Sequence, residues 1–496
     1  MSRRISIDPI TRLEGHGRIE IFLDEQGEVA NAYLQVPELR GFELFCVGRP
    51  AEDMPNITSR ICGVCPEAHQ MAAVKALDQL FGTPPPSVAR KLRELLYMAF
   101  FVSDHTTHFY ALGGPDFIVG PDAGASERNI LGVIRKVGLD VGKQVIDCRA
   151  RNGQVIKTIG GREIHPTAAL PGGWSKPLSE DERCQVEEIA RKNIDFALFT
   201  LQTFDTVVLN NTIYREMIEG DVYLHRTYSM GTVDEQNRLN LYDGKIRVVD
   251  PEGREFLKYD STQYASHIAE RVEPWTYMKF PYLREKGWNG FVDGMDSGVY
   301  SATPLSRLNV CDGLATPRAQ QEYERFYRHF GKKKVDGRYE PVHHRMATHW
   351  ARLIELLYAS EHMLELATDP EITCPDVRAK IGTITGVGIG SVEAPRGTLT
   401  HHYTTDQNGI LNGVNLIVGT TNNHAAMAMS VQRAAKELIH GGVAPEGLLN
   451  RVEMAFRLYD PCMSCATHSL PGTMPLVLNI RNGRAELLQT LRRDGQ

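Results

Sequence analysis

The amino-acid sequence predicts an α+β protein in which a central bundle of long helices is flanked by small peripheral β-sheets. Long segments repeat apolar residues at helical spacing, and three other regions alternate apolar and polar residues as strands do. Neither internal repeats nor low-complexity linkers divide the chain. With 496 residues, 42% of them apolar, it can bury a large core. We therefore expect one large unit rather than several independent domains.

The predicted strands fall into three regions. Residues 17–36 alternate around a glycine-containing turn and predict a β-hairpin near the N-terminus. A second β-rich region covers about 222–249, where the dipeptide Asp243-Gly244 is typical of a tight hairpin turn. A third region covers 389–418. We expect each region to form a small sheet at the edge of the helices.

The predicted long helices lie between these strand regions. They cover residues 87–112, 181–204 and 348–369, and each repeats apolar residues at helical spacing. The first of them is apolar on most of its faces, so we expect it in the centre of the bundle. Another helix is predicted to begin at Pro66, because the fixed φ of proline suits a first helical turn.

Charge and hydropathy argue against several classes of function. The formal net charge is −6, and the longest basic run is the short Lys332–Lys334, so we expect no nucleic-acid partner. No stretch of about 18 consecutive apolar residues occurs, which predicts neither a signal peptide nor direct membrane insertion. Five of the nine cysteines stand singly, a poor fit to a secreted disulfide framework. We therefore expect a cytoplasmic protein.

Two Cys-x-x-Cys pairs are the main chemical signal. Cys62 and Cys65 stand just before the helix that begins at Pro66, where unpaired N–H groups and the helix dipole lower the pKa of a thiol. Cys462 and Cys465 repeat the spacing near the C-terminus, and a histidine follows each pair. We expect the four thiolates to converge on one site.

Three kinds of site are compatible with these cysteines. A thioredoxin-type disulfide would use one pair and leave the other idle. A structural zinc site would use all four, but its pairs usually stand about 15 to 20 residues apart. Here 397 positions separate Cys65 from Cys462. The third possibility is a catalytic centre of a soft transition metal held between the two ends of the chain. Spacing alone leaves zinc and a catalytic metal open.

Further motifs surround the two pairs: RLEGHG (12–17), RGFE (40–43), RICGVCPEAH (60–69), SDHTTHFY (103–110), GGREIHP (160–166), WTYMKFPY (275–282), VEAPRG (392–397) and DPCMSCATH (460–468). With these motifs the sequence resembles, over essentially its whole length, the large subunit of a nickel-iron hydrogenase. It looks most like the soluble cytoplasmic multi-subunit branch, which includes NAD-linked and heterodisulfide-reductase-linked enzymes. The resemblance implies the hydrogenase large-subunit fold and reversible cleavage of H2 into protons and electrons.

The resemblance also implies roles for the four cysteines. Cys62 and Cys462 would be terminal nickel ligands, whereas Cys65 and Cys465 would bridge nickel to iron. His69 follows Cys65 by one helical turn, and we expect it to hydrogen-bond a cysteine sulfur rather than to bind a metal.

The iron in this family carries one CO and two CN ligands, and three residues would form its pocket. These are Pro395, Arg396 and Thr420, with Thr420 hydrogen-bonding a cyanide and Arg396 presenting its guanidinium above the open metal position. Burying a cyanide nitrogen without a hydrogen-bond donor would cost free energy, and the threonine hydroxyl would supply that donor. Cys462 would take the first proton from H2, and Glu14 would pass it on as a carboxyl tuned toward neutral pH.

A second ion, usually magnesium, would be held by Glu43, the main-chain carbonyl of Leu416 and His468, which are hard or borderline ligands. Relatives are made as precursors that a protease cuts after the histidine of the C-terminal motif. We therefore predict a single large-subunit domain at 1–468 and an extension at 469–496, with a strand-turn-strand pattern, that is removed on maturation.

The resemblance requires partners. No other cysteine motif could hold an iron-sulfur cluster, so an iron-sulfur small subunit is implied, with further electron-transfer subunits that bind flavin or NAD or act on heterodisulfides. Two other functions compete with this one. A non-catalytic, complex-I-like core subunit would share the fold, but such relatives have lost the four cysteines. A structural zinc protein would differ in its metal content.

Overall fold

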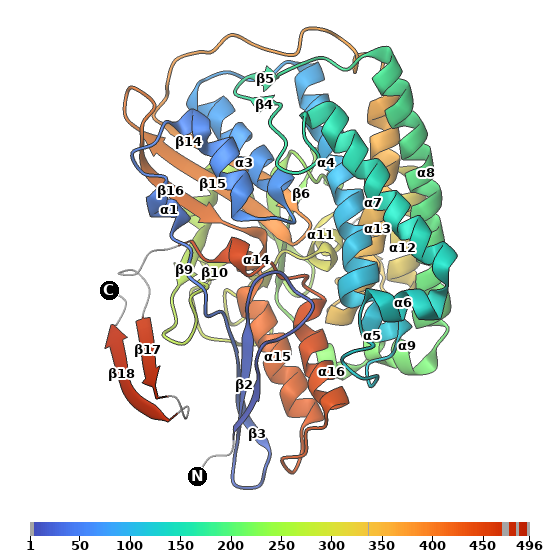
Figure 1. Ribbon diagram of the computed structural model, residues 1–496, viewed down its shortest axis with the longest axis vertical. Helices are drawn as coiled ribbons and strands as arrows, with labels where there is room; N and C mark the ends of the chain where they lie inside the picture. Colours follow the sequence, from blue (N-terminus) through green and yellow to red (C-terminus); the bar gives the residue numbers. More distant parts are fainter. Residues whose placement is uncertain (1–3, 336, 469–475, 483–485, 494–496) are drawn as a thin grey trace.

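The computed structural model describes residues 4–335, 337–468, 476–482 and 486–493. It confirms the predicted α+β architecture, with long helices side by side and small sheets at their edge (Figure 1). The bundle contains α4 (Ser87–Thr107), α7 (Leu139–Gly160), α8 (Glu180–Phe204), α12 (Pro317–His329) and α13 (Thr348–Ala367). None of the described helices combines the length and apolar character needed to cross a membrane.

Helices α4 and α13 form the centre of this bundle. Helix α13 packs against α4, α8 and α12, while α4 also packs against α7. Most residues of both central helices are buried, as expected for helices that are apolar on most faces. The predicted segment 87–112 is α4 followed by a π-helical turn, His108–Gly113. The other two predicted helices are α8 and α13.

Three small sheets include the regions predicted as strands. The first contains β1 (Arg4–Ile7), β2 (Arg18–Leu23) and β3 (Val29–Gln35). The second has the order β11 (Tyr300–Ser301), β6 (Tyr228–Val233), β7 (Lys245–Val249) and β8 (Glu255–Tyr259). The third contains β14 (Val387–Ala394), β15 (Gly397–Thr405) and β16 (Leu411–Ile417). Strands β1, β8 and β11 extend these sheets beyond the predicted regions.

One turn prediction is wrong. Strands β6 and β7 do pair as an antiparallel hairpin, but residues 234–244 connect them, so Asp243-Gly244 is not a two-residue turn. The side chain of Asn240 accepts hydrogen bonds from the N–H groups of Tyr242 and Asp243 and folds this end of the loop on itself. The dipeptide therefore ends a longer loop and leads into β7.

The remaining elements are short or lie at the periphery. The strand pairs are β4 (Ala169–Leu170) with β5 (Gly173–Trp174), β9 (Ile268–Arg271) with β10 (Phe280–Leu283), β12 (Lys334–Val335) with β13 (Arg338–Tyr339), and β17 (Leu476–Arg481) with β18 (Leu487–Arg493). The other helices include α1 (Phe42–Phe45), α2 (Met54–Thr58), α3 (Pro66–Leu80), α5 (Pro115–Ile118), α6 (Ile130–Val137), α9 (Thr212–Glu219), α11 (Pro304–Val310), α14 (Gly419–Asn422), α15 (His424–Leu438) and α16 (Glu446–Arg457).

Elements from both ends of the chain meet in the middle of the molecule. Helix α3 packs against β14 and β15, and α15 packs against both β3 and α16. The loop after β1 reaches the C-terminal cysteine loop, where Glu14 and Cys462 form a parallel β-bridge. The predicted strand-turn-strand of the extension is the pair β17 and β18, drawn in red at the left of Figure 1. Gly483, in the predicted turn, lies outside the described residues.

Candidate metal centre

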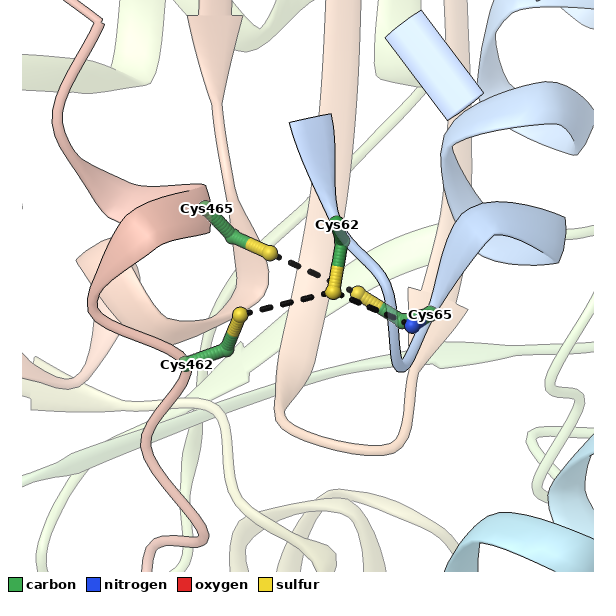
Figure 2. Close-up of side chains that lie close together, drawn as sticks. All are labelled: Cys62, Cys65, Cys462 and Cys465. Atoms are coloured by element: carbon green, nitrogen blue, oxygen red, sulfur yellow. Dashed lines mark hydrogen bonds between the residues drawn. The ribbon is translucent and has the colours of Figure 1, made fainter. Parts of the chain in front are cut away.

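Four cysteine sulfur atoms meet between the two ends of the chain (Figure 2). The Sγ atoms of Cys62 and Cys462 lie 3.5 Å apart, and those of Cys65 and Cys465 lie 3.6 Å apart. All four sulfur atoms lie within 4.8 Å of one another, are buried and belong to free thiols. A tetrahedral site with metal–sulfur bonds of about 2.3 Å separates its sulfur atoms by about 3.8 Å. The quartet therefore has the size of a thiolate metal site.

The N-terminal pair is shaped by the start of α3. Cys65 is the N-cap residue of this helix and Pro66 is its first residue, as the sequence predicts. The N–H groups of Val64 and Cys65 point at Sγ of Cys62, at 3.2 and 3.0 Å. Donors of this kind stabilise a thiolate. In the C-terminal pair, Cys465 lies within a short 3-10 helix, Ser464–Ala466, and Cys462 precedes this helix.

The electrostatics of the quartet favour a cation. Burial opposes ionisation of Cys62, but hydrogen bonds from the neighbouring thiols and the charge of Arg396 hold its pKa well below the usual value. Burial raises the pKa values of Cys462 and Cys465 well above the usual value. A metal ion among the sulfur atoms would replace the protons of these thiols, because metal binding displaces protons from its ligands.

Glu14 is attached to the C-terminal cysteine loop by its side chain and its backbone. Sγ of Cys462 donates to Oε2 of Glu14 at 2.8 Å, and the N–H of Ser464 donates to the same oxygen at 3.2 Å. The N–H of Glu14 bonds the carbonyl of Pro461 at 3.3 Å, and its carbonyl accepts from Met463 at 2.9 Å. A carboxylate thus lies beside one of the four sulfur atoms.

Arg396 is fixed between two carboxylates that the sequence analysis did not select. Its Nη1 lies 3.0 Å from Oδ2 of Asp104, and its Nη2 lies 3.0 Å from Oδ2 of Asp460. Although burial opposes its charge, the two carboxylates raise the pKa of the Arg396 guanidinium well above the usual value. Both acids stand inside motifs that carry the family resemblance, SDHTTHFY and DPCMSCATH. Their place in these motifs is the sequence feature from which they could have been predicted.

Two other buried arginines hold the turn that contains Arg396. Pro395 and Arg396 connect β14 to β15 as a two-residue turn, because Ala394 pairs with Gly397. The carbonyl of Pro395 accepts hydrogen bonds from Arg307 at 3.3 Å and from Arg352 at 3.2 Å. These charged donors fix the backbone position of both predicted pocket residues.

Thr420 contacts the cysteine loop directly. Its Oγ1 accepts the N–H of Cys462 at 3.0 Å, so the hydroxyl keeps its own hydrogen to donate elsewhere. Helix α14, which carries Thr420, lies against the turn at Gly397. A Cβ at Gly397 would come within 2.6 Å of the carbonyl oxygen of Gly419, and the φ of Gly397 is +141°. Glycine at 397 therefore permits this close approach.

The three residues predicted to bind a second ion line a separate small cavity. The carboxylate of Glu43 accepts the N–H of Leu416 at 2.9 Å. Among the described residues, neither ring nitrogen of buried His468 has a hydrogen-bond partner, and burial holds its pKa well below the usual value, so the ring is a neutral imidazole. Glu270 and Lys279, which lie 3.3 Å apart, line the same cavity. The unpaired imidazole and the carboxylates fit a divalent ion.

The expectation for His69 is wrong. Its Nδ1 lies 3.1 Å from Nε2 of His401 on β15, and its Nε2 has no hydrogen-bond partner in the described part of the chain. The ring bonds another histidine rather than a cysteine sulfur because α3 packs against β15. Burial lowers the pKa of His69 to about 4, which keeps the ring neutral.

Comparison with known proteins identifies the family. Residues 40–127 and 143–468 match the model described as nickel-dependent hydrogenase. The chain belongs to the nickel-dependent hydrogenase family. Residues 4–39 match a further model, described as HoxL-like, so the N-terminal loop with Glu14 is also recognised. The resemblance found in the sequence is confirmed.

Relatives of this hydrogenase include archaeal and bacterial enzymes. It is 46% identical over 491 residues to an F420-non-reducing hydrogenase iron-sulfur subunit of Archaeoglobus profundus, covering 99% of each chain. It is 36% identical to the NAD-reducing hydrogenase HoxS subunit beta of Cupriavidus necator, covering 98% of this chain and 99% of that one. A crystal structure of an NAD+-reducing nickel-iron hydrogenase in the H2-reduced state superposes with a TM-score of 0.86, at 37% identity, over 94% and 99% of the chains.

These findings confirm the predicted activity. The chain is the catalytic large subunit of a nickel-iron hydrogenase, an oxidoreductase that acts on H2. The four cysteines are positioned to bind its metal centre. The family assignment selects this function over a structural zinc protein and over a non-catalytic, complex-I-like subunit.

Proposed function

We propose that the quartet holds a nickel-iron centre with one CO and two CN ligands on the iron, and that Glu14 removes the proton released from H2. Bound among the sulfur atoms, this centre would supply the metal site at which H2 is polarised. The observation that carries the proposal is the 2.8 Å contact between Sγ of Cys462 and Oε2 of Glu14. It joins a metal-ligand sulfur to a carboxylate base within hydrogen-bond reach.

The pairing of the sulfur atoms supports the division of ligand roles. Cys62 and Cys462, the proposed terminal nickel ligands, are adjacent at 3.5 Å. Cys65 and Cys465, the proposed bridging ligands, are adjacent at 3.6 Å. Among the proposed terminal ligands, Cys462 is the one in contact with Glu14, so we assign the first proton transfer to this sulfur.

Three residues of the surrounding protein would bind and orient the centre. The charge of Arg396 contributes to the lowered pKa of Cys62, so this guanidinium stabilises anionic sulfur. The hydroxyl of Thr420 keeps a hydrogen that can be donated to a cyanide nitrogen, and the turn at Pro395 would form the adjacent wall. We further propose magnesium between Glu43, the carbonyl of Leu416 and His468, supported by the ring nitrogens of that histidine, which have no partner among the described residues.

Electrons would leave through an iron-sulfur small subunit. Among the described residues, the four cysteines of the quartet form the one group of three or more metal-ligating side chains close enough to bind a single ion. The other five cysteines do not belong to such a group. One relative bears the name of an NAD-reducing enzyme, which supports a further NAD-linked subunit, and flavin- or heterodisulfide-linked subunits are the alternatives that we propose. Free thiols, two of them exposed, support a cytoplasmic location.

The test is an infrared spectrum of the purified protein with metal analysis of the same sample. We expect bands of metal-bound CO and cyanide, and about one nickel per chain. Cys465→Ser should lose the bands, whereas Cys374→Ser, at an exposed cysteine remote in sequence from both pairs, should keep them. Glu14→Gln should keep metals and bands but lose exchange of H2 with D2O. Stoichiometric zinc with a silent spectrum would reject the proposal.

A further inference from the structure

The turn between β14 and β15 is held by side chains that come from outside this hairpin. The carbonyls of Ala394 and Pro395 accept hydrogen bonds from the guanidinium of Arg307, at 2.9 and 3.3 Å. The carbonyl of Arg396 accepts from the side chain of Asn423 at 2.6 Å. Buried carbonyls require such partners. The position of the turn therefore follows the position of the Arg307 guanidinium.

Arg307, on α11, has no freedom to choose other partners. Its Nε and Nη2 donate to Oε1 and Oε2 of Glu355 at 2.6 and 2.7 Å, which is a two-point contact with one carboxylate. Nη2 also donates to the carbonyl of Pro395, and Nη1 donates to the carbonyl of Ala394 and to Oε2 of Glu393 at 3.2 Å. A guanidinium has five N–H groups, and these contacts use all five. Rotation of this group would break contacts to the turn.

Glu355, on α13, is fully buried and is itself fixed from a second helix. Nε2 of His105 on α4 lies 3.0 Å from its Oε2. Burial lowers the pKa of His105 to about 4, so the neutral ring donates from this nitrogen to the carboxylate. Burial opposes the charge of Glu355, but Arg307 and the hydrogen bond from His105 lower its pKa to about 2. The carboxylate therefore connects two central helices of the bundle to Arg307.

We propose that Glu355 is a positioning residue for the iron pocket. Through its two-point contact it fixes the guanidinium of Arg307, and Arg307 sets where Pro395 and Arg396 lie. Two parallel hydrogen bonds between a guanidinium and a carboxylate fix orientation as well as distance. This inference rests on the proposal that Pro395 and Arg396 form the pocket.

A purely structural role is the simpler explanation of a buried ion pair. Removing one partner of such a pair destabilises a fold wherever the pair lies, because the other charge is left buried and unpaired. The same helix offers a matched control for this explanation. Glu361 is 7% exposed and accepts the N–H groups of Arg318 and Ala319, at 3.2 and 2.9 Å. This buried carboxylate holds the first turn of α12 rather than the iron pocket.

The experiment compares Glu355→Gln and Glu361→Gln in the assembled enzyme, by infrared spectrum, metal content, thermal unfolding and kcat for H2 oxidation. We expect Glu355→Gln to keep its nickel and to shift the cyanide bands from their wild-type positions, because the walls of the pocket have moved. Its kcat should fall by about tenfold to a hundredfold, the cost of a small misplacement near the reacting atoms. Glu361→Gln should unfold at a lower temperature but keep the wild-type bands and kcat.

A second comparison tests whether Glu355 acts through Arg307. Arg307→Gln should shift the bands at least as far as Glu355→Gln does. The double variant should shift them no further than Arg307→Gln alone, because both substitutions break the same connection. It also removes both buried charges, so it provides a folded protein if one of the single variants does not fold. Glu355→Asp, which keeps the charge on a shorter side chain, should shift the bands less than Glu355→Gln.

Three results would overturn the positioning role. They are wild-type band positions in both Glu355 variants, shifts of equal size in Glu361→Gln, and additive shifts in the double variant. Each of them leaves the proposed centre standing, because the CO and cyanide bands are still present. A wild-type spectrum without these bands would overturn the proposed function, and this inference with it.

Discussion

His362 on α13 lies between two carboxylates. Its Nε2 is 3.0 Å from Oε1 of Glu94 on α4, and its Nδ1 is 2.9 Å from Oε2 of Glu365. Burial alone would lower the pKa of His362, but the two carboxylates outweigh it and raise the pKa to about 9. The folded value lies above the unfolded value of about 6.5. Protonation therefore stabilises the fold fully below about pH 6.5, and this contribution is lost as the pH rises through about 9.

We expect His362→Gln to lower the free energy of unfolding by about 1–3 kcal/mol at about pH 6, and by much less at about pH 10. The physical reason is that the charged hydrogen bonds to both carboxylates exist only while the ring is protonated. Urea unfolding at the two pH values measures the difference. A loss of equal size at both would contradict the charge-based explanation and indicate packing instead.

Residues with distinctive chemistry could be predicted from the sequence, and ordinary residues could not. The four cysteines stand in a spacing that few functions require, and RLEGHG drew attention to Glu14. Asp104 is a common helical aspartate in sequence, and it stands 292 positions from the arginine that it binds. Such a residue acquires its role when folding buries a guanidinium between it and Asp460. Glu270, beside the small cavity, was missed for the same reason.

At the scale of elements, helix α1 and the residue that follows its C-cap are unusual for their exposed apolar side chains. Leu44 is 56% exposed, Phe45 53% and Val47 40%. Phe45 also lines a cavity of about 890 Å3, together with Arg60 and Arg162. An apolar patch with a cationic rim is typical of an interaction surface.

This patch lies close to the metal centre. Arg40, which lines the same cavity, donates to the carbonyl of Ile61 at 2.6 Å and to that of Ser464 at 3.2 Å, so it contacts both cysteine loops. Electron transfer favours a partner cluster close to the nickel. We therefore expect the iron-sulfur small subunit to dock on α1, with acidic side chains against the arginines.

A double substitution of Leu44 and Phe45 by aspartate should weaken binding of the small subunit by about thirtyfold or more, because truncation of a central apolar anchor typically costs about 2 kcal/mol or more. Copurification and titration of the two subunits measure this. Ile213→Asp, at a site on α9 that is 62% exposed, is the control for an added surface charge. Unchanged binding by the double variant would place the partner elsewhere.

Helices whose apolar residues repeat regularly could be predicted from the sequence, whereas elements with an interrupted pattern or a short length could not. The three predicted long helices are present because each buries an apolar face over five or more turns. Helix α7 was missed: Gly142 and Gly153 interrupt its pattern, yet contacts with α4 and α8 hold it as a helix. Strand β1, only four residues long, forms because β2 offers it an edge.

At the scale of the whole molecule, the N-terminal and C-terminal parts of the chain meet at the metal centre. The loop with Glu14 and the loop with Cys462 hydrogen-bond each other, so the metal centre is complete only when both ends are in place. Residues 469–496 follow directly on His468, which is buried next to this contact between the two ends. Strands β17 and β18 in this extension form a two-stranded sheet of their own. An isolated hairpin adds little stability, so its removal should cost the fold little.

We expect active enzyme to end at His468, and chains produced without nickel to keep the extension through Gln496. Cutting there would leave a new carboxylate beside Glu43, whose N–H lies 3.5 Å from the carbonyl oxygen of His468, and would add negative charge to the proposed magnesium site. Intact-mass measurement on nickel-loaded wild type and on Cys465→Ser checks this. The variant should remain full length, because a centre that cannot assemble gives no signal for cutting. A nickel-loaded, active enzyme that retains Gln496 would show that the extension belongs to the mature protein, and that the structure around His468 forms without a free C-terminus.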